Sequence, residues 1–324
     1  MREVVDALSQ ARRIAVVSHR DPDGDTIGSA VALGLALESL GKIVTLHCAD
    51  PVPRTFAFLP SAARIRQDAP GADPDLVVTV DLGDGARAKL ALGAAAPVVN
   101  IDHHASNTRF GSVNWVDATS AATGEMVARV VDALGVPWTS EMATATLLAL
   151  MTDTGSFQFP NTDPRVLELA ARCIARGADL PAITYNVFRS RRAEAMKLWG
   201  SAFARLEQEE DGQLVWTWID RADLERAGGR EEDVAGLVEQ VARSTGMRVA
   251  LLFNAMVDGE VKLSCRTVPF APMVDAAALM GAFGGGGHSR AAGAIVKGPL
   301  EDVRARVLEA ARQALRTARA ASAA

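Results

Sequence analysis

Cysteine is scarce in this sequence of 324 residues, which contains only Cys48, Cys173 and Cys265. The three are far apart and form neither a Cys-x-x-Cys pair nor a zinc-ribbon spacing, which excludes a zinc finger and a disulfide-rich secreted domain. Each lies in or beside an apolar segment. We therefore expect three reduced cysteines in the core of a cytoplasmic protein.

Long apolar runs and an excess of positive charge are also missing. No apolar run reaches the roughly 18 residues that a membrane span needs. Residues 1–13 mix charges with apolar side chains at helical spacing, unlike a signal peptide. The formal net charge is −5, which argues against an extensive clamp on long duplex nucleic acid. We therefore expect neither a membrane nor a long duplex as a partner.

The first half of the chain alternates short apolar runs with helical patterns. This order predicts an α/β domain with a doubly wound, mostly parallel sheet, and the continuous apolar runs indicate strands buried on both faces. The expected strands are Ile14–Val17, Lys42–Leu46, Leu76–Val80 and Val98–Ile101. The main expected helices are Thr26–Leu40, Thr119–Leu134, Ser140–Met151 and Pro164–Arg176.

The pattern changes in the second half. Residues 188–210 are charged and helical in spacing, which predicts a helix that connects two domains. Strand patterns at Leu214–Ile219, Arg248–Asn254 and Val261–Arg266 then precede a terminal helical pattern, which is typical of a smaller α+β domain. We predict domain bounds of 1–187, 188–210 and 211–324.

Carboxylates and imidazoles gather where the expected strands and helices of the first half end. Such positions meet at the carboxyl edge of a parallel sheet, where open α/β sheets bind ligands. Taken singly, each has a plainer explanation as a solvated acidic turn, a strand-end turn or a polar loop. The residues concerned are His19, Asp23, Asp25, Asp81, His103 and Asp153.

Mixed oxygen and imidazole donors suit Mn²⁺ or a similar divalent ion. Six donors are too many for one catalytic ion that keeps an open position, and two ions sharing a carboxylate fit better. Such pairs lie roughly 3.5–4 Å apart and clamp the attacking and leaving oxygens of a displacement at phosphorus. Water between them is deprotonated near neutral pH, which supplies a hydroxide nucleophile.

These motifs resemble the DHH phosphoesterase superfamily. The run from His19 to Ser29 reads His-x-x-x-Asp-x-Asp-x-x-Gly-Ser, and Asp81, Asp102-His103-His104 and Thr152-Asp153-Thr154-Gly155 follow in the family's order. The second half resembles the DHH-associated C-terminal domain through Phe283-Gly284-Gly285-Gly286-Gly287-His288 and Ala291-Ala292-Gly293. The match covers most of the chain, and it looks most like the bifunctional oligoribonuclease (nanoRNase) and 3′-phosphoadenosine 5′-phosphate phosphatase branch.

The resemblance implies a role for each motif residue. It places His19, Asp23 and Asp81 on one metal ion, and Asp25, Asp81, His103 and Asp153 on the other, with Asp81 as the bridge. It implies that Asp102 orients His103 by a hydrogen bond, and that His104 faces the scissile phosphate and stabilises its developing charge. The expected catalytic residues are thus His104, Asp102 and Asp81.

The resemblance also implies that the second domain holds a terminal phosphate or nucleotide. Glycine N–H groups can cradle a phosphate, and arginine binds one in a planar, bidentate manner. By itself the glycine run equally describes a flexible loop, and Arg266 a surface strand residue. The expected substrate-binding residues are Arg266, Gly284, Gly285, Gly286, Gly287, His288 and His104.

The function implied is a two-metal phosphoesterase that cleaves di- to pentanucleotides to mononucleotides and 3′-phosphoadenosine 5′-phosphate to AMP. Linear or cyclic dinucleotides are further candidate substrates. The expected cofactors are two divalent ions, Mn²⁺ before Mg²⁺ or Co²⁺, and a homodimer is the expected oligomer, since it is the commonest one. The alternatives are a RecJ-like single-strand exonuclease, an inorganic pyrophosphatase and a nucleotide-sensing module without turnover.

Overall fold

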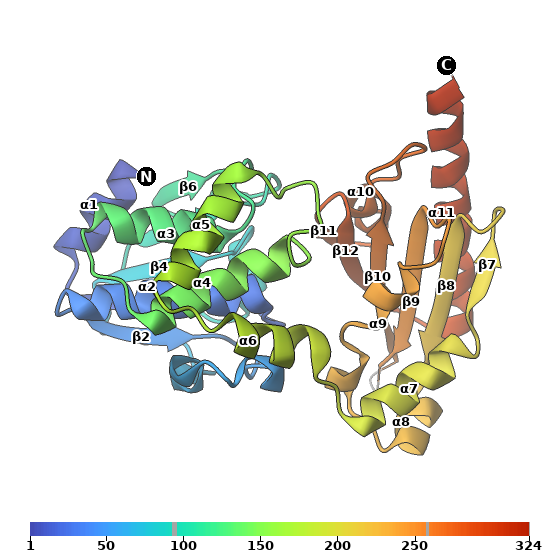
Figure 1. Ribbon diagram of the computed structural model, residues 1–324, viewed down its shortest axis with the longest axis horizontal. Coiled ribbons are helices and arrows are strands. Elements are labelled where there is room, and N and C mark those ends of the chain that lie inside the picture. Colours follow the sequence, from blue (N-terminus) through green and yellow to red (C-terminus); the bar gives the residue numbers. More distant parts are fainter. Residues whose placement is uncertain (93–95, 257–258, 324) are drawn as a thin grey trace. The chain divides into compact units, whose positions relative to one another are not determined.

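The computed structural model describes residues 1–92, 96–256 and 259–323 (Figure 1). The chain divides into two compact units, Met1–Ser190 and Arg191–Ala324. Across the described ranges, no helix has the length and apolar character needed to cross a bilayer. Cys48, Cys173 and Cys265 are all buried and free.

The first unit is built on six parallel strands. They lie in the order β3-β2-β1-β4-β5-β6, so the order reverses between β1 and β4. The expected α/β fold class is confirmed. The strands are β1 (Arg13–Val17), β2 (Ile43–His47), β3 (Ile65–Arg66), β4 (Leu76–Val80), β5 (Val98–Asp102) and β6 (Val113–Val116).

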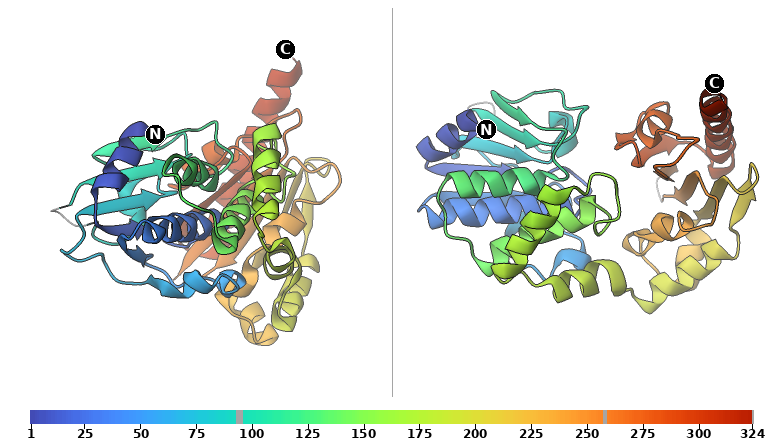
Figure 2. Two further views of the ribbon diagram at one scale, coloured as in Figure 1. Left: turned by 60° about the vertical axis from the view of Figure 1, so that its left-hand side comes forward. Right: turned by 45° about the horizontal axis from the view of Figure 1, so that its top comes forward.

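The helices of this unit form one apolar core with the sheet. Helices α2, α3 and α4 pack side by side along it (Figures 1 and 2). The helices are α1 (Arg2–Gln10), α2 (Gly24–Ser39), α3 (Thr123–Ala133), α4 (Ser140–Asp153), α5 (Pro164–Ala175) and α6 (Leu180–Ile183). Short 3-10 helices span Arg54–Phe56, Pro60–Arg64 and Gly85–Ala88, and a π-helical turn spans Thr184–Arg189.

The two faces of the parallel sheet are buried unequally. In β1, Ile14 and Val16 join the large core beneath the helices. The alternate residues Ala15 and Val17 join a smaller cluster with Ala88 from the 3-10 helix Gly85–Ala88. Burial on both faces explains why the strand reads as a continuous apolar run.

The second unit contains a mixed sheet in the order β11-β12-β10-β9-β8-β7, in which β8 pairs with β9 in parallel and the other neighbouring strands pair in antiparallel fashion. The strands are β7 (Glu207–Glu209), β8 (Leu214–Ile219), β9 (Val249–Ala255), β10 (Glu260–Thr267), β11 (Gly286–Gly287) and β12 (Ala291–Lys297). The helices are α7 (Ala193–Phe203), α8 (Arg221–Ala227), α9 (Leu237–Val241), α10 (Ala276–Gly281) and α11 (Leu300–Ala323), with a 3-10 helix at Glu231–Val234.

The stretch 188–210 contains both a helix and a strand. Helix α7 fills part of it and buries Leu198, Trp199 and Ala202 in a core that it shares with α8 and with Leu252 of β9. Strand β7 follows as the edge of the second sheet. The domain bounds 1–187, 188–210 and 211–324 stay predictions.

Helices α2 and α4 approach each other closely at Gly28. A Cβ atom at this position would lie 2.3 Å from the backbone oxygen of Ala145. We expect Gly28→Ala to reduce the free energy of unfolding by about 1–3 kcal/mol, since added atoms force packed backbones apart. Thermal denaturation followed by circular dichroism measures the change.

The matched control is Gly200→Ala in helix α7, where an added Cβ meets nothing within 4 Å. There the substitution should leave the melting temperature unchanged or raise it, because alanine has the higher helix propensity by about 1 kcal/mol. Equal melting temperatures for Gly28→Ala and the unaltered protein would contradict the close packing of α2 on α4.

Candidate metal centre

The site begins where the strand order of the first sheet reverses. Strands β1 and β4 are neighbours at this point, and the crevice outside their carboxyl ends is the usual ligand position of open α/β sheets. His19 lies two residues beyond β1, and Asp81 directly follows β4. The topology therefore brings an imidazole and a carboxylate from distant parts of the sequence to one crevice.

Asp81 lies among three imidazoles. Its Oδ2 atom is 3.3 Å from Nε2 of His19, and its Oδ1 atom is 3.7 Å from both Nε2 of His103 and Nδ1 of His104. The hydroxyl of Thr26 donates to Oδ2 at 2.6 Å, and the hydroxyl of Thr123 donates to Oδ1 at 3.1 Å. The residue is buried and has a left-handed backbone, with φ at 58°, a strained conformation that clusters at functional sites.

A second group of donors surrounds His103. Its Nε2 atom lies 3.1 Å from Oδ2 of Asp153 and 3.7 Å from Oδ2 of Asp25. Asp25 is fully buried, and its carboxylate accepts the backbone N–H groups of Thr123 and Gly124 at 2.7 and 2.9 Å. These two N–H groups open helix α3, so the positive end of the helix dipole faces the buried negative charge.

The six predicted metal ligands thus come together in two groups. His19, Asp23 and Asp81 have donor atoms within 4.8 Å of one another, as do Asp25, His103 and Asp153. Asp23 differs from the others because its side chain is 55% exposed and caps helix α2 by accepting the N–H of Thr26 at 3.0 Å. Carboxylate oxygens and imidazole nitrogens this close together fit divalent cations.

Negative charge dominates the electrostatics of the crevice. Burial, and then the charge of Asp81, raise the pKa of Asp25 well above its ordinary value. Burial alone would lower the pKa of His19, but its hydrogen bond to Asp81 and the charges of Asp23 and Asp81 raise it to about 9. The crevice therefore favours positive charge, as a protonated imidazole or as a cation.

The predicted partner of Asp102 is wrong. Its Oδ1 atom lies 2.8 Å from Nδ1 of His104, whereas Nδ1 of His103 faces the backbone oxygen of Ser120 at 3.2 Å. Strand β5 ends at Asp102, and the ring of the next residue, His103, lies between Ser120 and Asp153, the last residue of α4. The residue oriented by Asp102 is therefore His104.

Asn107 supports this pair from the following turn. Its amide donates to Oδ2 of Asp102 at 2.5 Å and to Oδ1 of Asn100 at 2.8 Å. Asn100 in turn donates to the hydroxyl of Thr79 at 2.9 Å. The roles of Asn107, Thr26 and Thr123 are not predicted by the sequence motifs. The first two lie within or just after recognised motifs, but nothing local marks Thr123.

The predicted substrate residues in the second unit occupy the end of β10 and the edge of its sheet. Arg266 donates from Nη2 and Nε to Oε1 of Glu239 at 2.5 and 3.1 Å, so the guanidinium already has a carboxylate partner in helix α9. A Cβ atom at Gly285 would lie 2.1 Å from the backbone oxygen of Gly293. The glycine run is therefore also required for the close approach of the chain to β12.

The remaining glycines and His288 form the exposed turn around β11. Gly284 and Gly287 have positive φ values of 76° and 139°, which side chains other than glycine rarely adopt. Gly286, Gly287 and His288 are exposed, and the backbone N–H of His288 donates to the oxygen of Ala291 at 2.8 Å. The turn thus presents backbone at the surface of the second unit.

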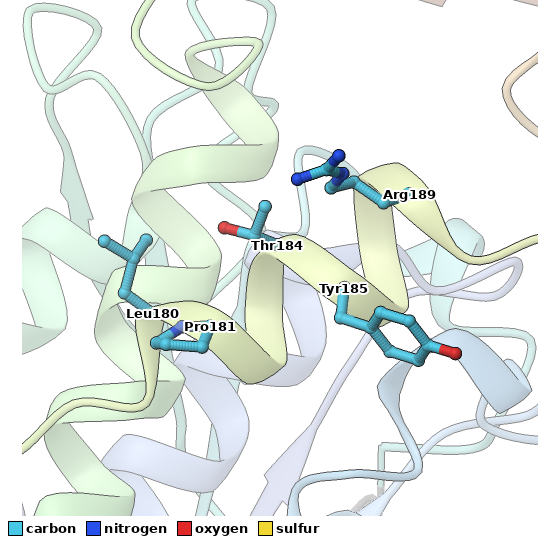
Figure 3. Close-up of a pocket in the computed structure, with 5 residues that line it drawn as sticks. All are labelled: Leu180, Pro181, Thr184, Tyr185 and Arg189. Atoms are coloured by element: carbon cyan, nitrogen blue, oxygen red, sulfur yellow. The ribbon is translucent and has the colours of Figure 1, made fainter.

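A separate pocket of the first unit lies along α6 and the π-helical turn. It has a volume of about 680 Å³ and contains none of the predicted site residues. Figure 3 shows the side chains that line it, which are Leu180, Pro181, Thr184, Tyr185 and Arg189. The candidate metal centre is therefore distinct from this pocket.

Two family models match separate parts of the chain. Residues 13–150 match the model of the DHH family, N-terminal domain, and residues 212–317 match that of the DHHA1 domain. The structure superposes on that of an exopolyphosphatase-related protein from Bacteroides fragilis with a TM-score of 0.86, at 21% identity over 98% of this chain and 96% of the other. At that identity the similarity establishes the fold.

Two curated relatives extend over nearly the whole chain. The bifunctional oligoribonuclease and PAP phosphatase NrnA of Thermus thermophilus is 37% identical over 321 residues, which are 97% of this chain and 94% of the relative. The protein of the same name from Bacillus subtilis is 24% identical over 298 residues, covering 91% and 92%. With both domain models matched in order and 37% identity to a curated relative over 97% of its length, the chain belongs to the DHH family of phosphoesterases, in the branch that carries a DHHA1 domain.

Proposed function

We propose that this protein hydrolyses di- to pentanucleotides of RNA to mononucleotides and 3′-phosphoadenosine 5′-phosphate to AMP. The observation that carries the proposal is the position of Asp81, whose two carboxylate oxygens face the two donor groups. Relatives that are named oligoribonuclease and PAP phosphatase support the choice of substrates. Linear and cyclic dinucleotides belong to the same chemical class.

The residues of the crevice would hold two divalent cations, for which Mn²⁺ is proposed. One set of ligands is His19, Asp23 and Asp81, and the other is Asp25, Asp81, His103 and Asp153. When bound, such a pair supplies a water of lowered pKa and neutralises the charge on the phosphate. Thr26 and Thr123 hold the carboxylate of Asp81 in place, and the N-terminus of α3 holds that of Asp25.

His104 is the proposed donor to the scissile phosphate. Burial alone would lower the pKa of His104, but its hydrogen bond to Asp102 and the charges of Asp81 and Asp102 raise it. The hydrogen bond between Nδ1 and Asp102 orients the ring, and Nε2 is proposed to carry the N–H that donates to a phosphate oxygen. Such a preorganised donor stabilises charge that develops in the transition state.

The proposed substrate site of the second unit comprises Arg266, Gly284–Gly287 and His288. An arginine and exposed glycine backbone suit a phosphate, and Glu239 holds the guanidinium in a defined orientation. A short substrate agrees with the net charge of −5, which offers little attraction for a long duplex.

Assembly and compartment are further parts of the proposal. A homodimer is proposed on the general ground that it is the commonest oligomer. A cytoplasmic location is proposed because all three cysteines are buried and unpaired, as is usual in a reducing compartment.

Substrate length is the first test. With Mn²⁺ present, we expect rapid release of mononucleotides from a 5′-phosphorylated dinucleotide and little from a long single strand at equal concentration of ends. Chromatography of the products measures both. Equal or faster cleavage of the long strand would favour a RecJ-like exonuclease, and hydrolysis of pyrophosphate alone would favour a pyrophosphatase.

Asp81→Asn should reduce kcat by more than the roughly 10–100-fold that loss of an outer-shell metal partner costs, because the change removes charge from both donor groups at once. Initial rates on the dinucleotide measure the loss. Asp6→Asn on the exposed face of helix α1 is the control and should leave the rate unchanged. Activity of Asp81→Asn within threefold of the unaltered protein would refute the two-metal mechanism.

Removal of metal is an independent test. Chelation should abolish hydrolysis, and added Mn²⁺ should restore it. Each bound ion should also raise the melting temperature, since a ligand at about 100 times its Kd stabilises the folded state by about 2.7 kcal/mol. Titrations with Mn²⁺, Mg²⁺ and Co²⁺ rank the ions. Full activity after exhaustive chelation would contradict a metal centre.

A further inference from the structure

The segment between β10 and α10 exposes two large apolar side chains. Phe270 is 65% exposed and Met273 is 58% exposed, and Phe270 is the most exposed aromatic side chain among the residues that the structure describes. The next residue, Val274, is buried, as is Ala276. The segment is therefore anchored at the core while it presents an aromatic ring to solvent.

This segment is attached to the glycine-rich turn. Thr267, the last residue of β10, donates its backbone N–H to the oxygen of Arg290 and its hydroxyl to the oxygen of Ser289, both at 3.0 Å. Ser289 directly follows His288, and Phe270 lies four residues beyond Arg266. The loop that carries Phe270 is thus adjacent to both parts of the proposed phosphate site, Arg266 and the glycine-rich turn.

Two arginines accompany the exposed ring. Arg290 donates from Nη1 to the backbone oxygen of Val268 at 2.6 Å, and its Nη2 lies 3.3 Å from Sδ of Met273. Arg248 donates to the backbone oxygen of Phe270 at 3.4 Å. Within the described ranges neither arginine forms an ion pair with a carboxylate, and the acidic residue of the segment, Asp275, instead accepts the backbone N–H of Ala278 at the start of α10.

We propose that Phe270, flanked by Arg248 and Arg290, is a stacking site for one nucleobase of a short RNA whose phosphate lies at the glycine-rich turn. An exposed aromatic side chain on a loop that also binds two guanidinium groups suits single-stranded nucleic acid, because the guanidinium charges attract phosphates and every base has a stacking face. The inference rests on the proposed function and adds a base-binding element to it.

The test compares substrates with and without a base, using the Mn²⁺-loaded full chain. The probes are 5′-phosphorylated diadenylate and its two abasic forms, each lacking one adenine. We expect Phe270→Ala to raise KM for diadenylate about 5-fold or more, as loss of one base–aromatic stack does, with little change in kcat. With the unaltered protein, one abasic form should have a KM raised by a similar factor. Phe270→Ala should not raise the KM for that abasic form any further.

Two variants serve as controls. Phe270→Trp keeps a stacking face and should retain the KM of the unaltered protein. Phe203→Ala removes another exposed phenylalanine, 43% exposed and located on α7, and should leave KM unchanged. An equal melting temperature for Phe270→Ala and the unaltered protein shows that the loop substitution preserves the fold.

The outcomes separate the two proposals. Hydrolysis of diadenylate with the same KM for Phe270→Ala and the unaltered protein would overturn the stacking site alone. An equal rise in KM for diadenylate and for both abasic forms would overturn it too, since the loop would then act without a base. No hydrolysis of diadenylate by the unaltered protein would overturn both proposals.

Discussion

The central constraint in this protein is mutual repulsion among carboxylates that the fold removes from water. Asp25 and Asp81 are both buried at the carboxyl edge of the first sheet, where an unpaired charge is costly. The structure surrounds them with three imidazoles, three hydroxyl groups and the N-terminus of α3. These partners hold the carboxylates in fixed positions, and the remaining negative charge favours cations.

The close packing of α2, α3 and α4 brings the carboxylates of Asp25 and Asp153 to the same site. Asp25 lies in the first turn of α2, and Asp153 is the last residue of α4. The two can share a site because small residues allow the helices to approach closely, as at Gly24, where a Cβ would lie 2.4 Å from the side chain of Thr152. At Gly124, the second residue of α3, a Cβ would lie 2.4 Å from Cβ of Ala149 in α4. The close contacts of the core and the geometry of the site thus depend on the same glycines.

The second unit uses a different chemistry, based on arginine and exposed backbone. Its glycine run is fixed by the close approach of Gly285 to β12, and Arg266 is oriented by Glu239. Beside them, the loop of Phe270 combines an exposed aromatic ring with two arginines that bind backbone oxygens. The candidate metal centre is therefore built from carboxylates and imidazoles of the first unit, and the proposed phosphate site from arginine and glycine residues of the second.

The sequence by itself determined the elements that carry the site. Strand β4 ends at Val80 as its apolar run predicts, and the helical spacing of Thr26–Leu40 correctly indicates α2, which begins two residues earlier, at Gly24. These features are local, because strand and helix periodicity and turn residues act over a few positions. The ligand candidates could be named because they follow these elements directly.

Only the tertiary structure decided which groups face one another. The contact between Asp25 and Thr123 spans 98 positions of the chain, and the pairing of Arg266 with Glu239 depends on how α9 packs on its sheet. At the end of β5, the direction of each side chain decides which histidine Asp102 contacts. Asp102 contacts His104, whereas His103 contacts the backbone oxygen of Ser120. Periodicity carries no information on such contacts, since they arise from the packing of segments that are distant in sequence.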